Sequence, residues 1–161
     1  MLLALINLGN HYLYPIAIWR KNLNEPIHIQ FGVKADSLQM EQITKLLGIK
    51  PTSGWNPGEI YLSKNKKGEQ IVQVKRNRPP FGVWHFSTKE KQFPEMAGHA
   101  LYLLEVLETA RESIEELLRL PDHEVVISFW YVGPVGFDVS ASVLSRLASL
   151  CHRTTFRFFE S

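Results

Sequence analysis

The chain has 161 residues, of which 45% are hydrophobic and 11% aromatic, and it carries 18 Lys and Arg against 16 Asp and Glu. This composition excludes the disordered class, in which burial is too small to offset chain entropy, and the length suits one domain of ordinary size. The net charge of +2 does not by itself imply a nucleic-acid or membrane partner, and the single cysteine, Cys151, excludes an internal disulfide and favours a reducing cytoplasm.

The first 26 residues are predicted to be an appendage outside the main domain, which we place at residues 27–161. The stretch up to Ile18 is hydrophobic, but it has no basic start, and Asn7 and the Gly-Asn-His run at positions 9–11 interrupt it. It therefore lacks the pattern of a secretory signal, and it falls short of the about 20 mostly apolar residues that cross a bilayer. We expect no membrane partner and a cytoplasmic location.

Residues 27–33 are predicted to form a half-buried strand, because apolar and polar side chains alternate along them. Asp36 then stands where the cap of a helix is expected, with Gln39 three residues further on. The helix should end at Gly48, since glycine enters the left-handed region at little cost. The turn-rich residues 51–58 are expected to be a loop.

Two strands joined by a hairpin turn are predicted next, over residues 59–63 and 69–75. Two prolines then interrupt the pairing, and a strand resumes over residues 81–87. The longest helix is predicted over residues 95–119, where leucines recur at helical spacing opposite a face of glutamates.

The C-terminal part is predicted to be a strand, a glycine loop, a helix and a strand. Residues 124–132 are apolar on both faces, so we expect a central strand with helices on one side and aromatic side chains on the other. Ser140 should cap the last helix. The last strand is expected after it, over residues 154–159. The order predicts an α+β fold: a mainly antiparallel sheet with helices on one face, with a ferredoxin-like βαββαβ core plus an added αβ unit.

Three segments together resemble a known family: residues 40–55 with Gly58, the run from Gly82 to Trp84, and residues 124–159. In their order and spacing they are similar to the bacterial domain of unknown function numbered 4279, over roughly residues 27–160. The resemblance implies an intracellular bacterial domain of about this size without an assigned activity. It supplies no catalytic residues.

Trp55, Trp84 and Trp130 are candidates for the lining of one aromatic pocket, with His85 as a candidate at its rim. Tryptophan suits such sites because it combines a large apolar area with one polar N–H group. The alternative for each ring is simple packing in the core. A shared pocket would point to a small-molecule-binding protein or a weakly hydrolytic enzyme.

The strongest electrostatic signal lies in residues 64–78, where six basic residues accompany one acidic residue, Glu69, and give a local balance of +5. Such a segment can follow a phosphate backbone while bases stack on nearby rings, so nucleic-acid binding is an alternative function. Lysines that keep a sheet edge soluble are the competing interpretation. The basic residues are Lys64, Lys66, Lys67, Lys75, Arg76 and Arg78.

No catalytic residue, metal site or cofactor is expected. The six histidines lack the spacing of metal ligands. Cys151 stands beside His152, but neighbours that enter a strand point to opposite faces and cannot easily share a proton. We therefore lean away from an enzyme and predict a non-enzymatic protein-interaction module of regulatory or immunity-like type, with a protein partner and with homodimerisation left open.

Overall fold

The computed structural model describes residues 27–59, 62–64, 70–72, 80–132 and 137–159. The predicted appendage, residues 1–26, lies outside the described residues. In chain order the elements are β1 (His28–Ala35), α1 (Met40–Leu47), β2 (Ser53–Trp55), β3 (Leu62–Lys64), β4 (Gln70–Val72), β5 (Gly82–Ser87), α2 (Met96–Glu108), α3 (Arg111–Arg119), β6 (His123–Val132), α4 (Ala141–Ala148) and β7 (Arg153–Phe159).

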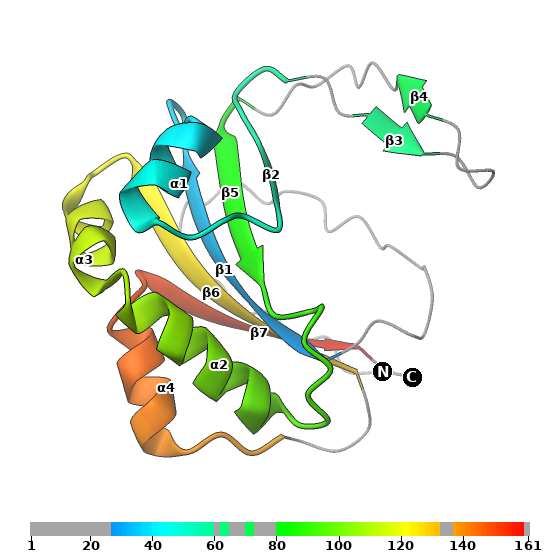
Figure 1. The fold of residues 1–161 in the computed structure, drawn as a ribbon, viewed down its shortest axis with the longest axis vertical. Coiled ribbons are helices and arrows are strands. Elements are labelled where there is room, and N and C mark those ends of the chain that lie inside the picture. Colours follow the sequence, from blue (N-terminus) through cyan, green and yellow to red (C-terminus); the bar gives the residue numbers. More distant parts are fainter. Residues whose placement is uncertain (1–26, 60–61, 65–69, 73–79, 133–136, 160–161) are drawn as a thin grey trace, which may run out of the picture.

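The described residues form an α+β fold, as predicted, with a five-stranded sheet and four helices (Figure 1). The strand order is β2-β5-β1-β6-β7. Every neighbouring pair is antiparallel except β6 and β7, which are parallel. The sheet is therefore mixed and mostly antiparallel. Strands β3 and β4 pair antiparallel in a separate two-stranded sheet, in agreement with the predicted hairpin.

The core lies between the sheet and the helices, which cover one side of it in Figure 1. Alternate residues of β1 and β6 point to this side and are fully buried, because side chains of a strand alternate between faces. Helix α2 packs against β1, α1 against β5 and α3 against β6. The strand residues concerned are Ile29, Phe31, Val33, Val125, Ile127 and Phe129.

The first helix begins later than predicted. Its N-cap is Gln39, whose side chain makes no capping hydrogen bond, and the expected cap Asp36 is exposed outside the helix. The Met40 N–H instead donates to Oδ1 of Asn56 at 2.8 Å. A capping oxygen thus comes from a loop that is distant in sequence. The predicted end at Gly48 is confirmed, with φ at 66° in the left-handed region.

The region predicted as a loop, residues 51–58, contains strand β2. Ser53 lies opposite His85 and Trp55 opposite Val83 in an antiparallel pairing with β5. The segment lacks the alternation of a long strand because it has only three paired residues. The pairing places Trp55 on the sheet rather than in a free loop.

The predicted long helix is two helices. Helix α2 ends at Glu108 and α3 begins at Arg111. The Thr109 hydroxyl donates to the Val106 carbonyl at 2.7 Å, a local side-chain bond of the kind that bends helices. Each helix can therefore turn its own apolar stripe toward the sheet.

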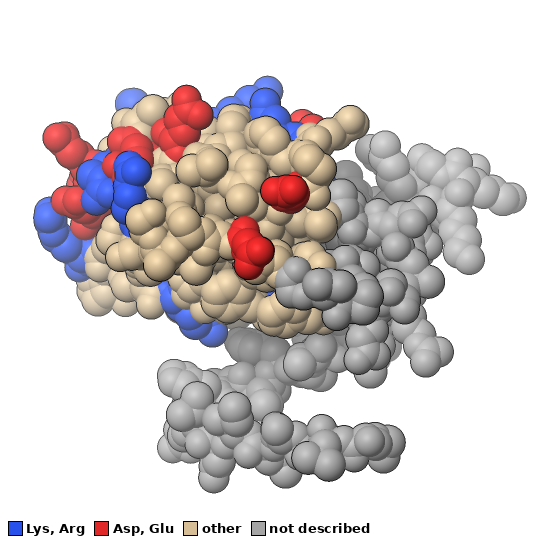
Figure 2. All heavy atoms as spheres, turned by 90° about the horizontal axis from the view of Figure 1, so that it is seen from below, with Lys and Arg blue, Asp and Glu red and all other residues tan. Residues whose placement is uncertain are grey.

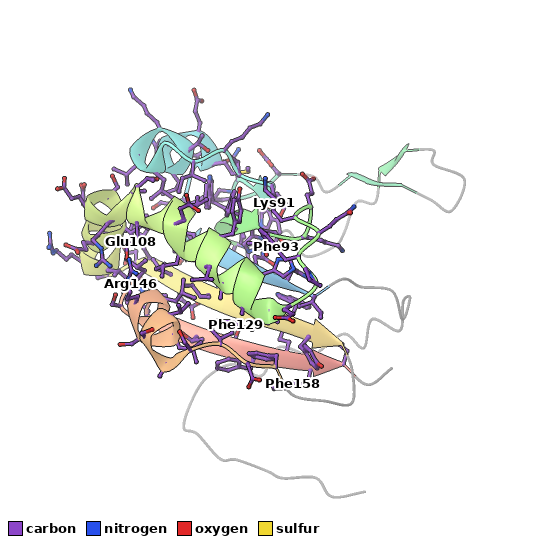
Figure 3. The ribbon with its side chains drawn as sticks, turned by 60° about the horizontal axis from the view of Figure 1, so that its bottom comes forward. Lys91, Phe93, Glu108, Phe129, Arg146 and Phe158 are labelled. Atoms are coloured by element: carbon purple, nitrogen blue, oxygen red, sulfur yellow. The ribbon has the colours of Figure 1, made fainter. Side chains whose placement is uncertain are left out.

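One carboxylate joins α2, α3 and α4 at this break. The Arg111 Nε–H donates to Glu108 at 2.7 Å, and Arg146 of α4 donates to the same carboxylate at 3.0 Å. Figure 3 shows Glu108 and Arg146 pointing toward one another. The hydrogen bond from Arg111, opposed by some desolvation and reinforced by Arg146, lowers the pKa of Glu108 to about 2.

The last helix and strand follow the prediction closely. The Ser140 hydroxyl accepts a hydrogen bond from the Val143 N–H at 3.4 Å, so the predicted cap is confirmed. Helix α4 buries Leu147, and the chain then enters β7. Strand β7 runs parallel to β6. Because it is last in the strand order, it forms an edge of the described sheet.

Candidate functional site

The side of the sheet opposite the helices is here called the helix-free face. Strand registers place one set of alternating side chains on it. Most of these residues are partly exposed, and they combine rings, hydroxyls and charges. The set includes Trp55 of β2, His85 of β5, His28, Gln30 and Lys34 of β1, Glu124, Val126, Ser128 and Trp130 of β6, and Arg153, Thr155, Arg157 and Phe159 of β7.

Trp84, a predicted pocket residue, lies on the other side of the sheet. It is 0% exposed and packs edge-on against Phe31 in the core, with ring centroids 6.1 Å apart. Its Nε1–H donates to Oγ1 of Thr44 at 3.0 Å, which ties β5 to α1. Trp84 therefore does not share a surface with Trp55, His85 and Trp130.

Trp55 and His85 do come together on the helix-free face. Their rings meet edge to face with centroids 6.3 Å apart, and Trp55 Nε1–H donates to the Phe81 carbonyl at 3.1 Å. The His85 ring lies over Gly32, where an added Cβ would stand 2.8 Å from Cδ2 of the ring. Desolvation by burial lowers the pKa of His85 to about 4, so the ring is neutral near pH 7.

Trp130 belongs to a second group of rings. It stacks with His28 at 5.5 Å and with Phe159 at 5.6 Å between ring centroids, and the Arg157 guanidinium lies 4.8 Å from the Trp130 ring centroid. Such an arrangement combines ring stacking with a cation–π interaction.

The two groups of rings lie too far apart to form one pocket. Trp55 is level with Glu124 across the sheet, and Trp130 lies six residues further along β6. At about 4.8 Å per strand and about 3.4 Å per residue, the Cα atoms of the two tryptophans are roughly 25 Å apart. A shallow depression of about 340 Å³ lies elsewhere and holds no ring. It is lined by Gln39, Glu41, Gln42, Lys45 and Asn56.

The predicted basic patch is mostly outside the described residues. Lys66, Lys67, Lys75, Arg76 and Arg78 fall there, and Lys64 is described only as the last residue of β3. Nucleic-acid binding through these residues stays a prediction.

Cys151 and His152 make separate interactions. The His152 Nδ1 accepts from the Val125 N–H at 3.0 Å, and Nε2 lies 3.0 Å from the Leu118 carbonyl, to which it donates in the neutral tautomer. The Cys151 sulfur contacts the Leu147 carbonyl at 3.7 Å. Both ring nitrogens of His152 are thus occupied by backbone groups, so the imidazole joins β6 and α3 and is not oriented toward the thiol.

A partly exposed group of aromatic rings, here called the aromatic edge, lies on the helix side of β6 and β7. It consists of Tyr131, Phe137, Phe156 and Phe158. Phe137 stacks on Phe156 and Phe158 with centroid distances of 6.1 and 6.2 Å. Figure 3 shows Phe158 near the margin of the sheet and Phe129 further in. Phe156 stacks on the buried Phe129 with ring centroids 4.9 Å apart, but it is still 47% exposed, and Phe158 is 64% exposed, so the core covers these two rings only in part.

The charged residues of β7 point back across the sheet. Arg153 donates to Glu124 of β6 at 2.5 Å, and Arg157 lies over Trp130 of β6. Figure 2 shows a mostly uncharged surface on the face seen from below, interrupted by two acidic groups, with most of the other charged residues gathered toward one end. The outer side of β7 therefore lacks the outward lysines and prolines that commonly protect a sheet edge.

The exposed phenylalanines of β7 were not among the predicted site residues. The available signal was the density of rings in residues 154–159, which is high for a strand that follows a short helix. Sequence periodicity cannot show that this strand is at an edge, because neighbours in a sheet are often distant in sequence.

Within the described ranges, no three His, Cys, Asp or Glu side chains gather into a group that could hold a metal ion. Among the helices of the same residues, none is both long and apolar enough to cross a bilayer.

The structure thus defines an α+β protein whose mixed sheet ends in an exposed aromatic strand. The family model Domain of unknown function (DUF4279) matches residues 25–156, and the chain belongs to this family, as the sequence resemblance predicted. No curated protein matches the chain, and no solved structure does so either.

Proposed function

We propose that this chain is a non-enzymatic protein-interaction module, regulatory or immunity-like in role, that binds a partner along β7 and the aromatic edge. The observation that carries the proposal is the exposure of two adjoining phenylalanines, Phe156 and Phe158, at the end of the sheet. Exposed aromatic groups beside an open strand are typical of binding surfaces, where rings supply area and main-chain groups supply hydrogen bonds.

The finer form of the fold is part of the same proposal. We infer a ferredoxin-like βαββαβ core made of β1, α1, β2, β5, the α2–α3 pair and β6, with α4 and β7 as the added αβ unit. The antiparallel order β2-β5-β1-β6 supports it. In this arrangement the added unit supplies the proposed surface. We place the domain at residues 27–161 and the protein in the cytoplasm, where its thiol stays reduced.

The proposed surface can be tested with a matched pair of serine variants. Phe158→Ser removes an exposed ring of the aromatic edge, and Leu101→Ser removes a side chain of α2 that is exposed to a similar degree, 56% against 64%. Neither change should greatly affect folding, because most of each side chain is in water.

The tagged full-length chain and both variants would be used for affinity capture from the native host. We expect the wild type and Leu101→Ser to retain the same stoichiometric protein partner and Phe158→Ser to lose it. Equal retention by both variants would show that the aromatic edge is not the interface. Turnover of a small molecule without any captured protein would contradict the proposed class of function.

Nucleic-acid binding remains a second candidate, favoured by one feature of the helix-free face. Two cations lie over rings there, Arg157 over Trp130 at 4.8 Å and Lys34 over Phe81 at 4.1 Å. Rings and cations on a sheet are the elements that proteins use to stack bases and contact phosphates.

This candidate predicts that Lys34→Ala with Arg157→Ala weakens binding of a fluorescent single-stranded RNA and reduces its salt dependence. The comparison variant neutralises the predicted basic segment at Lys66, Lys67, Arg76 and Arg78. Fluorescence anisotropy over a salt series that shows no RNA binding by the wild type would exclude this candidate and leave the protein-interaction proposal in place.

A further inference from the structure

We propose that the partner seated on β7 is a second copy of this chain, whose own β7 pairs antiparallel with the first about a two-fold axis at Phe156. This inference rests on the interaction surface proposed above and names its occupant. The pairing would join two five-stranded sheets into one continuous sheet.

The outer side of β7 is suited to such a pairing. Among the described strands, β7 pairs only with β6, and its seven residues include neither Pro nor Lys. Its two charged side chains, Arg153 and Arg157, are held over β6 by Glu124 and Trp130. An antiparallel pair of this length forms roughly six to eight main-chain hydrogen bonds.

The charges of β7 select the register. A two-fold axis at Phe156 places Arg153 opposite Phe159 and Thr155 opposite Arg157, so no two cations face each other. An axis at Thr155 would place Arg153 opposite Arg157, and an axis at Arg157 would place this residue opposite itself. Axes nearer either end of the strand leave fewer residues paired. Phe156 is therefore the centre that combines the longest pairing with no directly opposed cations, and the two copies of Arg157 then lie diagonally, with Cα atoms roughly 8 Å apart.

The same register uses the exposed rings. On the helix side, Phe156 meets its own copy and Phe158 lies opposite Thr154, so the two aromatic edges adjoin. Phe159, 42% exposed, lies on the other face beside the partner's Arg153.

The expected dimer is weak. The exposed parts of Phe156, Phe158 and Phe159 amount to roughly 300 Å² per copy, if a phenylalanine presents about 200 Å². The rings of two copies then bury about 600 Å², roughly half of the least area that a stable interface uses, and the strand backbones add to it. We expect a dissociation constant on the order of micromolar.

Disulfide trapping tests the register in the full-length chain. In a Cys151→Ser background, Phe156→Cys places two sulfurs at the axis, where opposed Cα atoms about 5 Å apart allow a disulfide. Phe158→Cys is the matched control, because its two copies would lie roughly 14 Å apart, which is too far for a bond. A mixture of Thr154→Cys and Phe158→Cys chains supplies a second opposed pair.

We expect the Phe156→Cys chain and the mixture to form disulfide-linked dimers, and the Phe158→Cys chain alone to stay monomeric. Sedimentation equilibrium of the unmodified chain should show a concentration-dependent dimer that Phe158→Ser weakens by about tenfold or more. Linkage of Phe158→Cys as readily as Phe156→Cys would overturn the register.

A chain that stays monomeric up to several hundred micromolar, well above the expected dissociation constant, would overturn the second copy as the occupant. The proposed function would survive that result if Phe158→Ser still lost a different captured protein, so the two failures are distinguishable.

Discussion

Replacing Thr88 by valine should destabilise the fold more than its nearly unchanged volume suggests. Thr88 is fully buried, and its hydroxyl connects two parts of the structure. The Ile29 N–H donates to Oγ1 at 2.9 Å, and Nδ1 of the buried His99 lies 2.8 Å from the same oxygen. The hydroxyl is thus a hydrogen-bond partner for a backbone N–H at the start of β1 and for a histidine ring nitrogen of α2.

The cost follows from the groups that lose a partner. Valine removes the partners of the Ile29 N–H and of His99 Nδ1, whereas the Ile29 carbonyl keeps the Thr88 N–H at 2.9 Å. Each buried polar group left without a partner costs about 1–3 kcal/mol, so Thr88→Val should cost about 2–6 kcal/mol. Thr88→Ser keeps the hydroxyl and removes one methyl group, which costs about 1 kcal/mol.

Denaturant unfolding followed by tryptophan fluorescence would measure both variants, since Trp84 is buried in the native state. We expect the midpoint to fall much further for valine than for serine, with an unchanged slope for both. If valine is as stable as the wild type, or more stable than serine, the hydroxyl does not hold these groups and the reasoning fails.

Three further predictions follow from the same contacts. Gly32→Ala should lower the free energy of unfolding by about 1–3 kcal/mol, because its Cβ would stand 2.8 Å from the His85 ring. Much of this loss should vanish in a His85→Ser background, and an equal loss in the wild-type and His85→Ser backgrounds would exclude this clash. The pKa of His85 is about 4 in the native state and about 6.5 in the unfolded chain, so the native state binds fewer protons between these pH values. The free energy of unfolding should therefore fall by at most about 3 kcal/mol as the pH drops through this range. A pH profile that is unchanged in His85→Gln would refute this. Glu108, paired with Arg111 and Arg146, has a pKa near 2 in the native state against 4.5 in the unfolded chain, so its stabilising contribution should be lost as the pH falls from 4.5 to 2. In Glu108→Gln, the loss of stability between these pH values should be smaller than in the wild type.

The amino-acid sequence determined the parts of this protein that depend on neighbours along the chain. The alternation in β1, the left-handed Gly48 and the Ser140 cap each arise within a few residues, because strand period, backbone sterics and capping bonds are local properties. The α+β class follows from the order of such elements. The family assignment likewise follows from local motifs in a fixed order.

Tertiary structure decided which residues meet. Asn56 reaches Met40 as a cap, and β2 forms on β5, through contacts that no periodicity within one segment encodes. Of the four predicted ligand-binding residues, Trp55 and His85 meet on the helix-free face, Trp84 enters the core, and Trp130 lies at the far end of the sheet. The exposure of Phe158 depends on β7 being last in the strand order, and sheet order is set by long-range packing of whole elements rather than by local preference.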